Sequence, residues 1–338
     1  MLRRLPLVLL VVLLALPVAC GGSDGTSAAP PATGGGGGIA DPAPVPTVPL
    51  EKLVIQPGGG RAFLLDALAG AEKSVRVVAY ALTDDAIEDA LVATAARGID
   101  VRAILPGDNA VNAEARAKLA RAGIPLTDGN PAFALTHEKA VVVDDDTAFV
   151  LTQNLSWSGF EINREFDAVI RGEPARDVAA IFDADWTGAT FAEPTDLVVS
   201  PTNSRARLVT LIDAAQASID VAMEVLTDDA MMDHLIARAQ SGVAVRVLLE
   251  DPAAISGNAA TGRALQQAGV QVRWLPSPDL HAKAVVTDGR FAYIGSVNFT
   301  WSSLGHNREL GLVTADEEAV ARIAATFDGD FANGRADF

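Results

Sequence analysis

The chain repeats itself at an offset of 144 residues, and this internal repeat limits the possible folds more than any other feature of the sequence. The run Thr83–Ala86 returns as Thr227–Ala230 at this offset. The offset becomes 146 at Leu119–Gly123 and is 144 again at His137. Compensating insertions and deletions of this kind belong in surface loops. Each copy is therefore a domain of about 140 residues with its own core, which is too long for a solenoid unit.

Each copy alternates short β-rich runs with stretches whose apolar residues recur at helical spacing. In the first copy, strands are predicted at 75–81, 101–105, 140–144, 147–151 and 166–171, and helices at 61–71, 84–96 and 111–122. In the second, strands are predicted near 219–225, 243–249, 283–287 and 291–295. The alternation predicts an α/β protein of two similar α/β/α sandwich half-domains related by pseudo-two-fold symmetry.

The first 20 residues have the pattern of an export signal. Arg3 and Arg4 form a basic start, and Leu5–Leu16 is an apolar run too short to span a bilayer. The small residues around Cys20 resemble a bacterial lipoprotein signal with this cysteine as the lipid acceptor. Because Pro17 departs from that pattern, cleavage with release stays open as an alternative.

Composition separates a linker from the folded part of the chain. Residues 21–50 are rich in glycine and proline and carry almost no charge, which predicts a flexible tether. After a signal at 1–20, the repeat places an N-terminal half-domain at 51–193 and a C-terminal half-domain at 194–338. Cys20 is the single cysteine, so the fold is expected to rely on core packing without an internal disulfide.

The formal net charge of −17 restricts the class of partner. A surface this acidic repels polyanions unless a local basic patch compensates, so the charge does not favour nucleic acid. Aromatic residues make up 5% of the chain, whereas grooves for single-stranded nucleic acid are aromatic-rich.

Two of the four histidines stand two residues before a lysine, at equivalent positions of the repeat. Each pair opens an H-x-K-x-x-x-x-D motif. The motif residues are His137, Lys139 and Asp144 in the first half and His281, Lys283 and Asp288 in the second. Strand geometry places the histidine and the lysine of each motif on one face. Chance would produce this duplication roughly once in a thousand such compositions, so the motif indicates function.

Two further elements follow each motif at matching spacing. They are Thr152 to Asn154 and Asn163 to Glu165 in the first half, and Ser296 to Asn298 and Asn307 to Glu309 in the second. This tandem pattern resembles the phospholipase D superfamily over residues 53–338. The resemblance implies a phosphodiesterase that uses no metal and no cofactor, with one active site shared by the two halves.

The resemblance also implies a division of roles between the histidines. His137 would form a phosphohistidine, while His281 would protonate the leaving oxygen and then activate water. The residues alone leave the reverse assignment open, because the halves are similar. Glu165 and Glu309 would accept a hydrogen bond from the far nitrogen of each histidine and fix its tautomer.

A phosphodiester is anionic, so hydrogen-bond donors must neutralise its non-bridging oxygens as charge builds in the transition state. Lysine suits this place because its ammonium acts as a compact point charge. The side chains predicted to contact the phosphate are Lys139, Lys283, Asn154, Asn298, Thr152 and Ser296.

Three expectations concern neighbours of these residues. Asp144 and Asp288 belong to the catalytic motif, but they are expected to support the loop and the lysine rather than touch the substrate. Leu151 stands where the second half has glycine, which leaves the local backbone conformation open. Trp157 and Trp301 are equivalent positions of the repeat, and core packing is favoured for them over contact with a lipid.

These features predict an exported phospholipase D-type enzyme that hydrolyses glycerophospholipids to phosphatidic acid and a head-group alcohol. The expected partner is a phospholipid at a membrane surface, and a monomer is expected because both half-sites lie in one chain. The expected location is the outer face of the bacterial cell membrane, through a lipid on Cys20, or the medium after release.

Two alternatives within the superfamily stay open, an exported nuclease and a phosphatidyltransferase. Among the transferases, a cardiolipin synthase is not favoured, because those enzymes usually begin with membrane-spanning segments and none is predicted here.

Overall fold

The computed structural model describes residues 46–191 and 195–337. The predicted export signal with Cys20, and the predicted tether as far as residue 45, lie outside these ranges. Among the described residues, the helices are too short or too polar to cross a membrane.

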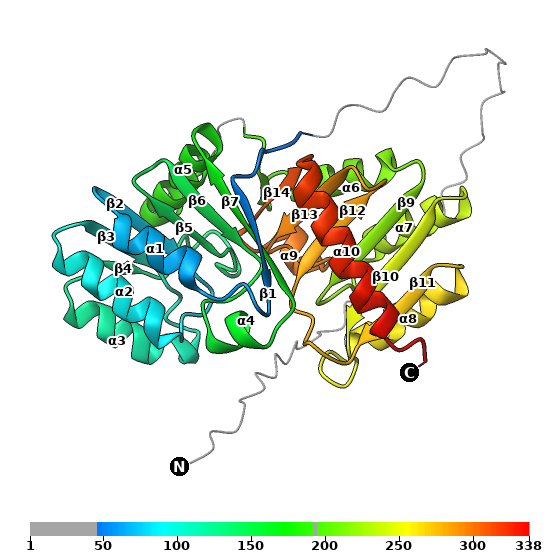
Figure 1. Ribbon diagram of the computed structural model, residues 1–338, viewed down its shortest axis with the longest axis horizontal. Coiled ribbons are helices and arrows are strands. Elements are labelled where there is room, and N and C mark those ends of the chain that lie inside the picture. Colours follow the sequence, from blue (N-terminus) through cyan, green and yellow to red (C-terminus); the bar gives the residue numbers. More distant parts are fainter. Residues whose placement is uncertain (1–45, 192–194, 338) are drawn as a thin grey trace, which may run out of the picture. The chain divides into compact units, whose positions relative to one another are not determined.

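The first half forms a seven-stranded sheet with helices in its connections (Figure 1). Its elements are β1 (Lys52–Gln56), α1 (Ala62–Gly70), β2 (Ser74–Val78), α2 (Asp85–Ala96), β3 (Asp100–Ile104), the short 3-10 helix η1 (Ala110–Asn112), α3 (Ala113–Arg121), β4 (Leu126–Thr127), β5 (Ala140–Val143), β6 (Thr147–Leu151), α4 (Trp157–Glu161), β7 (Glu165–Arg171) and α5 (Glu173–Thr187).

The second half forms another seven-stranded sheet. Its elements are β8 (Val198–Ser200), α6 (Ser204–Ala214), β9 (Ser218–Met223), α7 (Asp229–Gln240), β10 (Ala244–Glu250), α8 (Gly257–Gln267), β11 (Gln271–Leu275), β12 (Lys283–Thr287), β13 (Phe291–Gly295), α9 (Trp301–Gly305), β14 (Glu309–Thr314) and α10 (Glu317–Asn333).

Both sheets have the same strand order and the same mixture of directions. The orders are β1-β7-β6-β5-β2-β3-β4 and β8-β14-β13-β12-β9-β10-β11. In each sheet the last three strands of this order are parallel, and the other neighbours are antiparallel. The predicted α/β class with two similar half-domains is confirmed, and the sequence repeat corresponds to a repeat of the whole topology.

The repeated Thr-Asp-Asp-Ala run starts a helix in each half. The carboxylate of Asp84 accepts a hydrogen bond from the amide of Ile87 at the start of α2, and Asp228 accepts one from Met231 at the start of α7. An N-cap of this kind satisfies one of the amides that the first helical turn leaves unpaired. This conserved part of the repeat therefore serves helix formation.

Buried apolar residues form three clusters, of which one belongs to both halves. Two clusters lie within a single half each. The third contains Phe166 and Phe182 of the first half together with Leu248 and Leu280 of the second. Burying a large apolar side chain contributes about 1.5–3 kcal/mol. This shared cluster therefore joins the two halves into one folded body.

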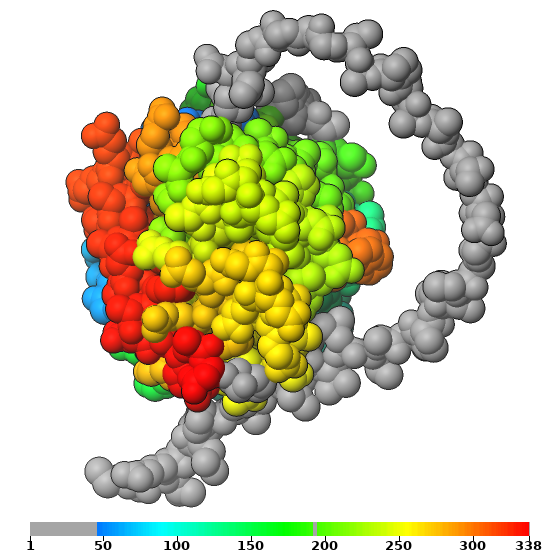
Figure 2. Space-filling model, turned by 90° about the vertical axis from the view of Figure 1, so that its right-hand side faces the viewer, coloured from blue at the N-terminus to red at the C-terminus, as the bar shows by residue number. Residues whose placement is uncertain are grey.

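The last helix closes the second half. Helix α10 lies across the second sheet (Figure 1). Beyond its end, Arg335 and Trp274 of β11 exchange two backbone hydrogen bonds of 2.9 Å. In Figure 2 the red end of the chain accordingly lies beside the golden segment that contains β11.

Candidate active site

The backbone at each motif histidine pairs with the backbone of the opposite half. The amide of His137 donates a hydrogen bond to the carbonyl of Arg308 at 2.9 Å. Two short parallel bridges pair the residue before each motif histidine with an arginine of the opposite half. Thr136 pairs with Arg308, and Leu280 pairs with Arg164. Each histidine therefore lies beside the Asn-x-Glu element of the opposite half.

The two histidines have crossed glutamate partners. Nδ1 of His137 bonds with Oε2 of Glu309 at 2.8 Å, and Nδ1 of His281 lies 2.8 Å from Oε1 of Glu165. Both glutamates are fully buried. A carboxylate at Nδ1 holds the ring proton there and leaves Nε2 for chemistry.

Burial lowers the pKa of His137; the charge of Glu309 opposes this shift and that of Lys139 adds to it. A lowered pKa keeps this imidazole neutral near pH 7, as an attacking nitrogen requires.

The two motif lysines are fully buried beside the histidines. Nζ of Lys139 donates to the carbonyl of His137 at 2.6 Å, and Nζ of Lys283 donates to that of His281. Burial lowers the pKa of Lys139 to about 7; Glu309 opposes this shift and the charge of Lys283 adds to it. Two buried lysines in one site favour an incoming anion, since the anion offsets the burial of their charged forms and the repulsion between them.

The two motif asparagines stand at equivalent positions but have different partners. Oδ1 of Asn298 accepts a hydrogen bond from the amide of Val225, and its Nδ2 donates to Oε2 of Glu224, both at 3.1 Å. Oδ1 of Asn154 is buried and has no hydrogen-bond partner among the described residues. The two half-sites are therefore not equivalent.

The difference arises at one repeat position that the sequence analysis did not single out. The first half has Tyr80, whose ring centroid lies 4.7 Å from that of His137 and 5.5 Å from Nζ of Lys139. The second half has Glu224, whose Oε2 lies 2.6 Å from Nζ of Lys283 and 3.8 Å from Nε2 of His281. The 144-residue offset aligns these two residues, so a search for breaks in the repeat near the motifs would have found them.

The hydroxyl residues Thr152 and Ser296 require a correction. Both were predicted to bind phosphate, and both are fully buried. The hydroxyl of Thr152 donates to Oε2 of Glu165 at 2.7 Å, and Ser296 bonds with the backbone of Leu310 beside Glu309. They therefore hold the glutamates in place, one layer behind the histidines.

The motif aspartates also require a correction, because they lie outside the catalytic group. The carboxylate of Asp144 accepts hydrogen bonds from the amides of residues 72–74 at 2.7 to 3.2 Å, and Asp288 does the same with residues 216–218. Both residues follow the far ends of β5 and β12, and both have a positive φ, 55° and 54°. The expected loop support is observed, but support of the lysines is not among their hydrogen bonds.

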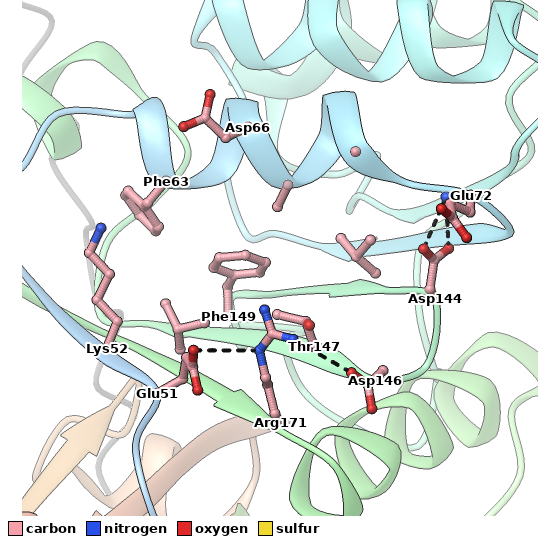
Figure 3. A pocket seen from close by; sticks show the side chains of 14 residues that line it. Glu51, Lys52, Phe63, Asp66, Glu72, Asp144, Asp146, Thr147, Phe149 and Arg171 are labelled. Carbon is pink, nitrogen blue, oxygen red and sulfur yellow. Dashed lines mark hydrogen bonds and ion pairs between the residues drawn. The ribbon is translucent and has the colours of Figure 1, made fainter.

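Figure 3 shows the surroundings of Asp144, a surface hollow of about 580 Å³. Its lining includes Phe63, Phe149 and Arg171, and it contains none of the motif histidines or lysines. The hollow lies at the opposite end of β5 from His137 and is separate from the candidate active site.

Leu151 fits the first half because the residues around this position differ from those around the equivalent Gly295 of the second half. It lies opposite Asp167 in the sheet, whereas Gly295 lies opposite Gly311. A Cβ on Gly295 would come within 2.6 Å of the Tyr293 hydroxyl and 2.5 Å of the Gly311 Cα. The second half thus needs glycine for space beside Tyr293. The first half has no such tyrosine, so β6 accepts leucine as an ordinary strand residue.

Two reciprocal ion pairs fasten the Asn-x-Glu elements. Arg308 contacts Asp185 of α5 through N–O distances of 2.7 and 2.9 Å, and Arg164 contacts Asp330 of α10 at 2.6 and 3.0 Å. Each pair joins one half to the other. The pairing follows the sequence repeat, since Asp185 and Asp330 occupy equivalent positions in the matching ends of the two halves.

The prediction of core packing for the two tryptophans is wrong. Trp157 is 59% exposed and Trp301 is 66% exposed. Leu135, at 37%, is the third large apolar side chain that is exposed in the described part of the chain. The short helices α4 and α9 bury Phe160 and Leu304, so their first residues point away from the core. All three exposed side chains lie within three residues of His137 or a motif asparagine.

Comparison with known families gives a match over both halves. A family model described as cardiolipin synthase, PLD-like domain, matches residues 64–186 and again 208–331. The cardiolipin synthase of Oceanobacillus iheyensis is 23% identical over 313 residues, which are 79% of this chain and 65% of that protein. The chain thus spans slightly less than two thirds of this relative's length.

Solved structures match over most of the chain. Polyphosphate kinase from Porphyromonas gingivalis matches with a TM-score of 0.67 at 16% identity, over 82% of this chain and 46% of that one. Phosphatidylserine synthase from Haemophilus influenzae matches with a TM-score of 0.65 at 11% identity, over 86% and 88%. At these identities the likeness establishes the fold alone.

Proposed function

The chain belongs to the phospholipase D superfamily, in the family described as cardiolipin synthase, PLD-like domain, and from this premise we propose that it transfers a phosphatidyl group from a phospholipid to an alcohol through a phosphohistidine. The observation that carries the proposal is the pair of crossed contacts, His137 with Glu309 and His281 with Glu165. They leave the Nε2 of each histidine for chemistry, and we propose that the two nitrogens act on opposite sides of a single phosphorus.

The proposed reaction has two steps. Nε2 of His137 attacks phosphorus, and the bond from phosphorus to the head-group oxygen breaks with its electron pair on that oxygen. The oxygen takes a proton from Nε2 of His281. In the second step the acceptor oxygen attacks phosphorus and gives its proton to His281, while the phosphorus–nitrogen bond breaks and its electron pair returns to His137. Buried Lys139 and Lys283 offset the negative charge in both steps.

The proposed acceptor is an alcohol, whereas the sequence alone favoured hydrolysis, in which water is the acceptor. Water and an alcohol use the same two steps, so the histidines do not distinguish them. A matched relative is named a cardiolipin synthase, and the family carries the same description. These names favour an alcohol as the acceptor.

A nuclease is less well supported. Holding a polynucleotide requires several phosphate contacts. The chain has a formal net charge of −17, and its two motif lysines serve one diester. A phospholipid presents a single diester, which matches this supply of cations.

The exposed tryptophans support a substrate presented at a lipid surface. Trp157 and Trp301 begin equivalent helices, three residues after the motif asparagines of each half. Tryptophan rings prefer the head-group region of a bilayer, which is also the depth of a phospholipid diester. We propose that the two rings rest in this region when the active site takes up a lipid.

Attachment to the membrane through Cys20 is also a proposal, since this residue lies outside the described ranges. Metabolic labelling with palmitate tests it. Label that is retained by the Cys20→Ser variant would contradict it.

The function is tested with vesicles of phosphatidylcholine and with glycerol in the buffer. Phosphatidylglycerol among the products demonstrates transfer, and phosphatidic acid alone would restore the hydrolysis hypothesis. DNA and RNA are offered in parallel reactions. Efficient cleavage of either, with no phosphatidyl product from the vesicles, would reject the proposal in favour of a nuclease.

A further inference from the structure

Glu224 breaks the symmetry of the site on the side of His281. The equivalent position of the first half holds the aromatic ring of Tyr80. A carboxylate in a pocket for a phosphodiester opposes substrate binding unless a cation compensates it. Lys283 supplies that cation at 2.6 Å. The ion pair offsets the charge of Lys283 in the second half-site.

The contacts of Glu224 leave one carboxylate oxygen available. Its interactions with Lys283, Asn298 and His281 all use Oε2. Oε1 has no hydrogen-bond partner in the part of the chain that the structure describes, and the side chain is 20% exposed. The pKa of Glu224 is lowered: burial would raise it, but the charges of His281 and Lys283 outweigh burial. An ionised oxygen thus remains free to accept a hydrogen bond beside His281.

The charges around this oxygen favour a neutral donor over a cation. Glu224 is already paired with Lys283. The neighbouring carboxyl of Glu250 accepts a hydrogen bond from the amide of Leu280, and burial raises its pKa to about 8, which keeps it mainly protonated at pH 7. The charge of Glu224 is therefore already offset by Lys283, which weakens its attraction for a second ammonium group, whereas a hydroxyl needs only the acceptor.

We propose that Oε1 of Glu224 accepts a hydrogen bond from a second hydroxyl of the alcohol that reacts beside His281, so that the second half-site selects a polyol. This inference rests on the proposed function. It concerns the leaving alcohol in the first step and the acceptor in the second, because both occupy the His281 side of phosphorus. The reacting hydroxyl still gives its proton to His281, and Glu224 positions the alcohol through its neighbouring hydroxyl.

The test measures how one phosphatidyl-enzyme divides between acceptors. Phosphatidylcholine is the donor, and glycerol, ethanolamine and ethanol are present together at equal concentration, so that the three lipid products differ in mass. The ratio of phosphatidylglycerol to phosphatidylethanol is independent of the amount of active enzyme. We expect it to exceed roughly ten, since a hydrogen bond to a charged group changes a rate by about ten- to a hundredfold.

Variants separate this role from a structural one. Glu224→Tyr, which copies the first half, should bring the ratio close to one, and Glu224→Gln, which keeps an acceptor, should lower it less. The matched control Tyr80→Phe changes the opposite half-site and should leave the ratio as in the wild type. A purely structural role of Glu224 would lower all products together and leave the ratio unchanged.

Three results would overturn the inference. One is an unchanged ratio in Glu224→Tyr, another is a wild-type ratio near one, and the third is a preference for ethanolamine over glycerol. If the wild type makes no phosphatidyl ester with any of the three alcohols, whether or not phosphatidic acid forms, the proposed transfer itself has failed, and this outcome is distinct from the other three.

Discussion

His137 and Glu309 are 172 residues apart in the chain, yet Nδ1 of the histidine bonds with Oε2 of the glutamate at 2.8 Å. The reverse contact, between His281 and Glu165, has the same length. Neither half-site contains its own orienting carboxylate. An isolated half would therefore hold a histidine without its partner, and the two halves must fold together to complete the site.

The first prediction concerns Glu309. Glu309→Gln should lower kcat roughly ten- to a hundredfold with a smaller change in KM, because an orienting partner acts on the histidine rather than on the bound substrate. Steady-state kinetics on vesicles measure it. Glu318→Gln on α10, whose side chain is 84% exposed, is the control and should behave as the wild type. Equal losses in both variants would contradict the orienting role.

The second prediction concerns the order of the histidines. His137→Ala and His281→Ala should each lose nearly all turnover, and the double variant should be little worse, since the two act as one unit. In His281→Ala, a donor whose leaving group needs no proton, phosphatidyl-p-nitrophenol, should still react, and a phosphatidyl adduct should accumulate on His137 and be visible by mass spectrometry of the intact protein. An adduct on His281 in the His137→Ala variant would reverse the assignment.

The third prediction is a pH dependence of anion binding. The pKa of Lys139 is lowered from 10.5 to about 7, so at pH values between these two the folded protein binds fewer protons than the unfolded chain, and the stability contribution of Lys139 rises with pH. A bound diester favours the charged form of Lys139. Between these two pH values, diester binding should therefore be accompanied by uptake of a proton from the solvent.

Calorimetry with dimethyl phosphate in buffers of different ionisation enthalpy should therefore show proton uptake above pH 7, with an affinity that falls as the pH rises. Lys139→Met should abolish the uptake, and the exposed Lys52→Met should retain it. Binding without proton uptake at pH 8.5 would show that Lys139 is already charged in the free site.

The fourth prediction concerns the tryptophans. The double change of Trp157 and Trp301 to alanine should lower the ratio of activity on vesicles to activity on a monomeric short-chain phospholipid by roughly tenfold, because interfacial rings act only on a lipid surface. Vesicle sedimentation measures the binding itself. The idea is refuted if both activities fall in the same proportion while sedimentation is unaffected.

The fifth prediction concerns stability at the junction of the halves. Asp185→Ala removes the carboxylate that pairs directly with the buried guanidinium of Arg308, which should lower the free energy of unfolding by about 3–5 kcal/mol. Asp330→Ala is the matched control, because its pair with Arg164 is more exposed, at 10% and 14% against 1% and 2%. Urea unfolding should show a larger loss of stability for Asp185→Ala than for Asp330→Ala. Equal losses would argue against burial as the cause.

Several features were predictable from the sequence because they depend on comparing the chain with itself or on short-range patterns. The 144-residue repeat predicted two similar halves, alternation predicted the α/β class, and spacing identified His137 and His281 with their lysines. The Thr-Asp-Asp-Ala run also has a local role, since an N-cap acts on an amide three residues away.

Other features depended on contacts between the halves. The Asn-x-Glu element follows the histidine motif at the same spacing in both halves, so spacing does not reveal that Glu309 serves His137 and Glu165 serves His281. Likewise, the hydroxyls of Thr152 and Ser296 match the chemistry of a phosphate site, but packing buries them behind the glutamates. Trp157 and Trp301 are of a residue type that usually packs in a core, but the short helices that they begin turn both side chains outward.

The sequence by itself determined which residues could carry chemistry and that two copies of the fold would form, because residue type and periodicity are properties of the chain. Only the tertiary structure decided which half completes which histidine, and that the repeat position held by Tyr80 and Glu224 lies beside the motif histidine of its own half. The physical reason is that hydrogen bonds and desolvation act over a few ångströms in space, and the two sheets bring together residues that the chain separates by more than a hundred positions.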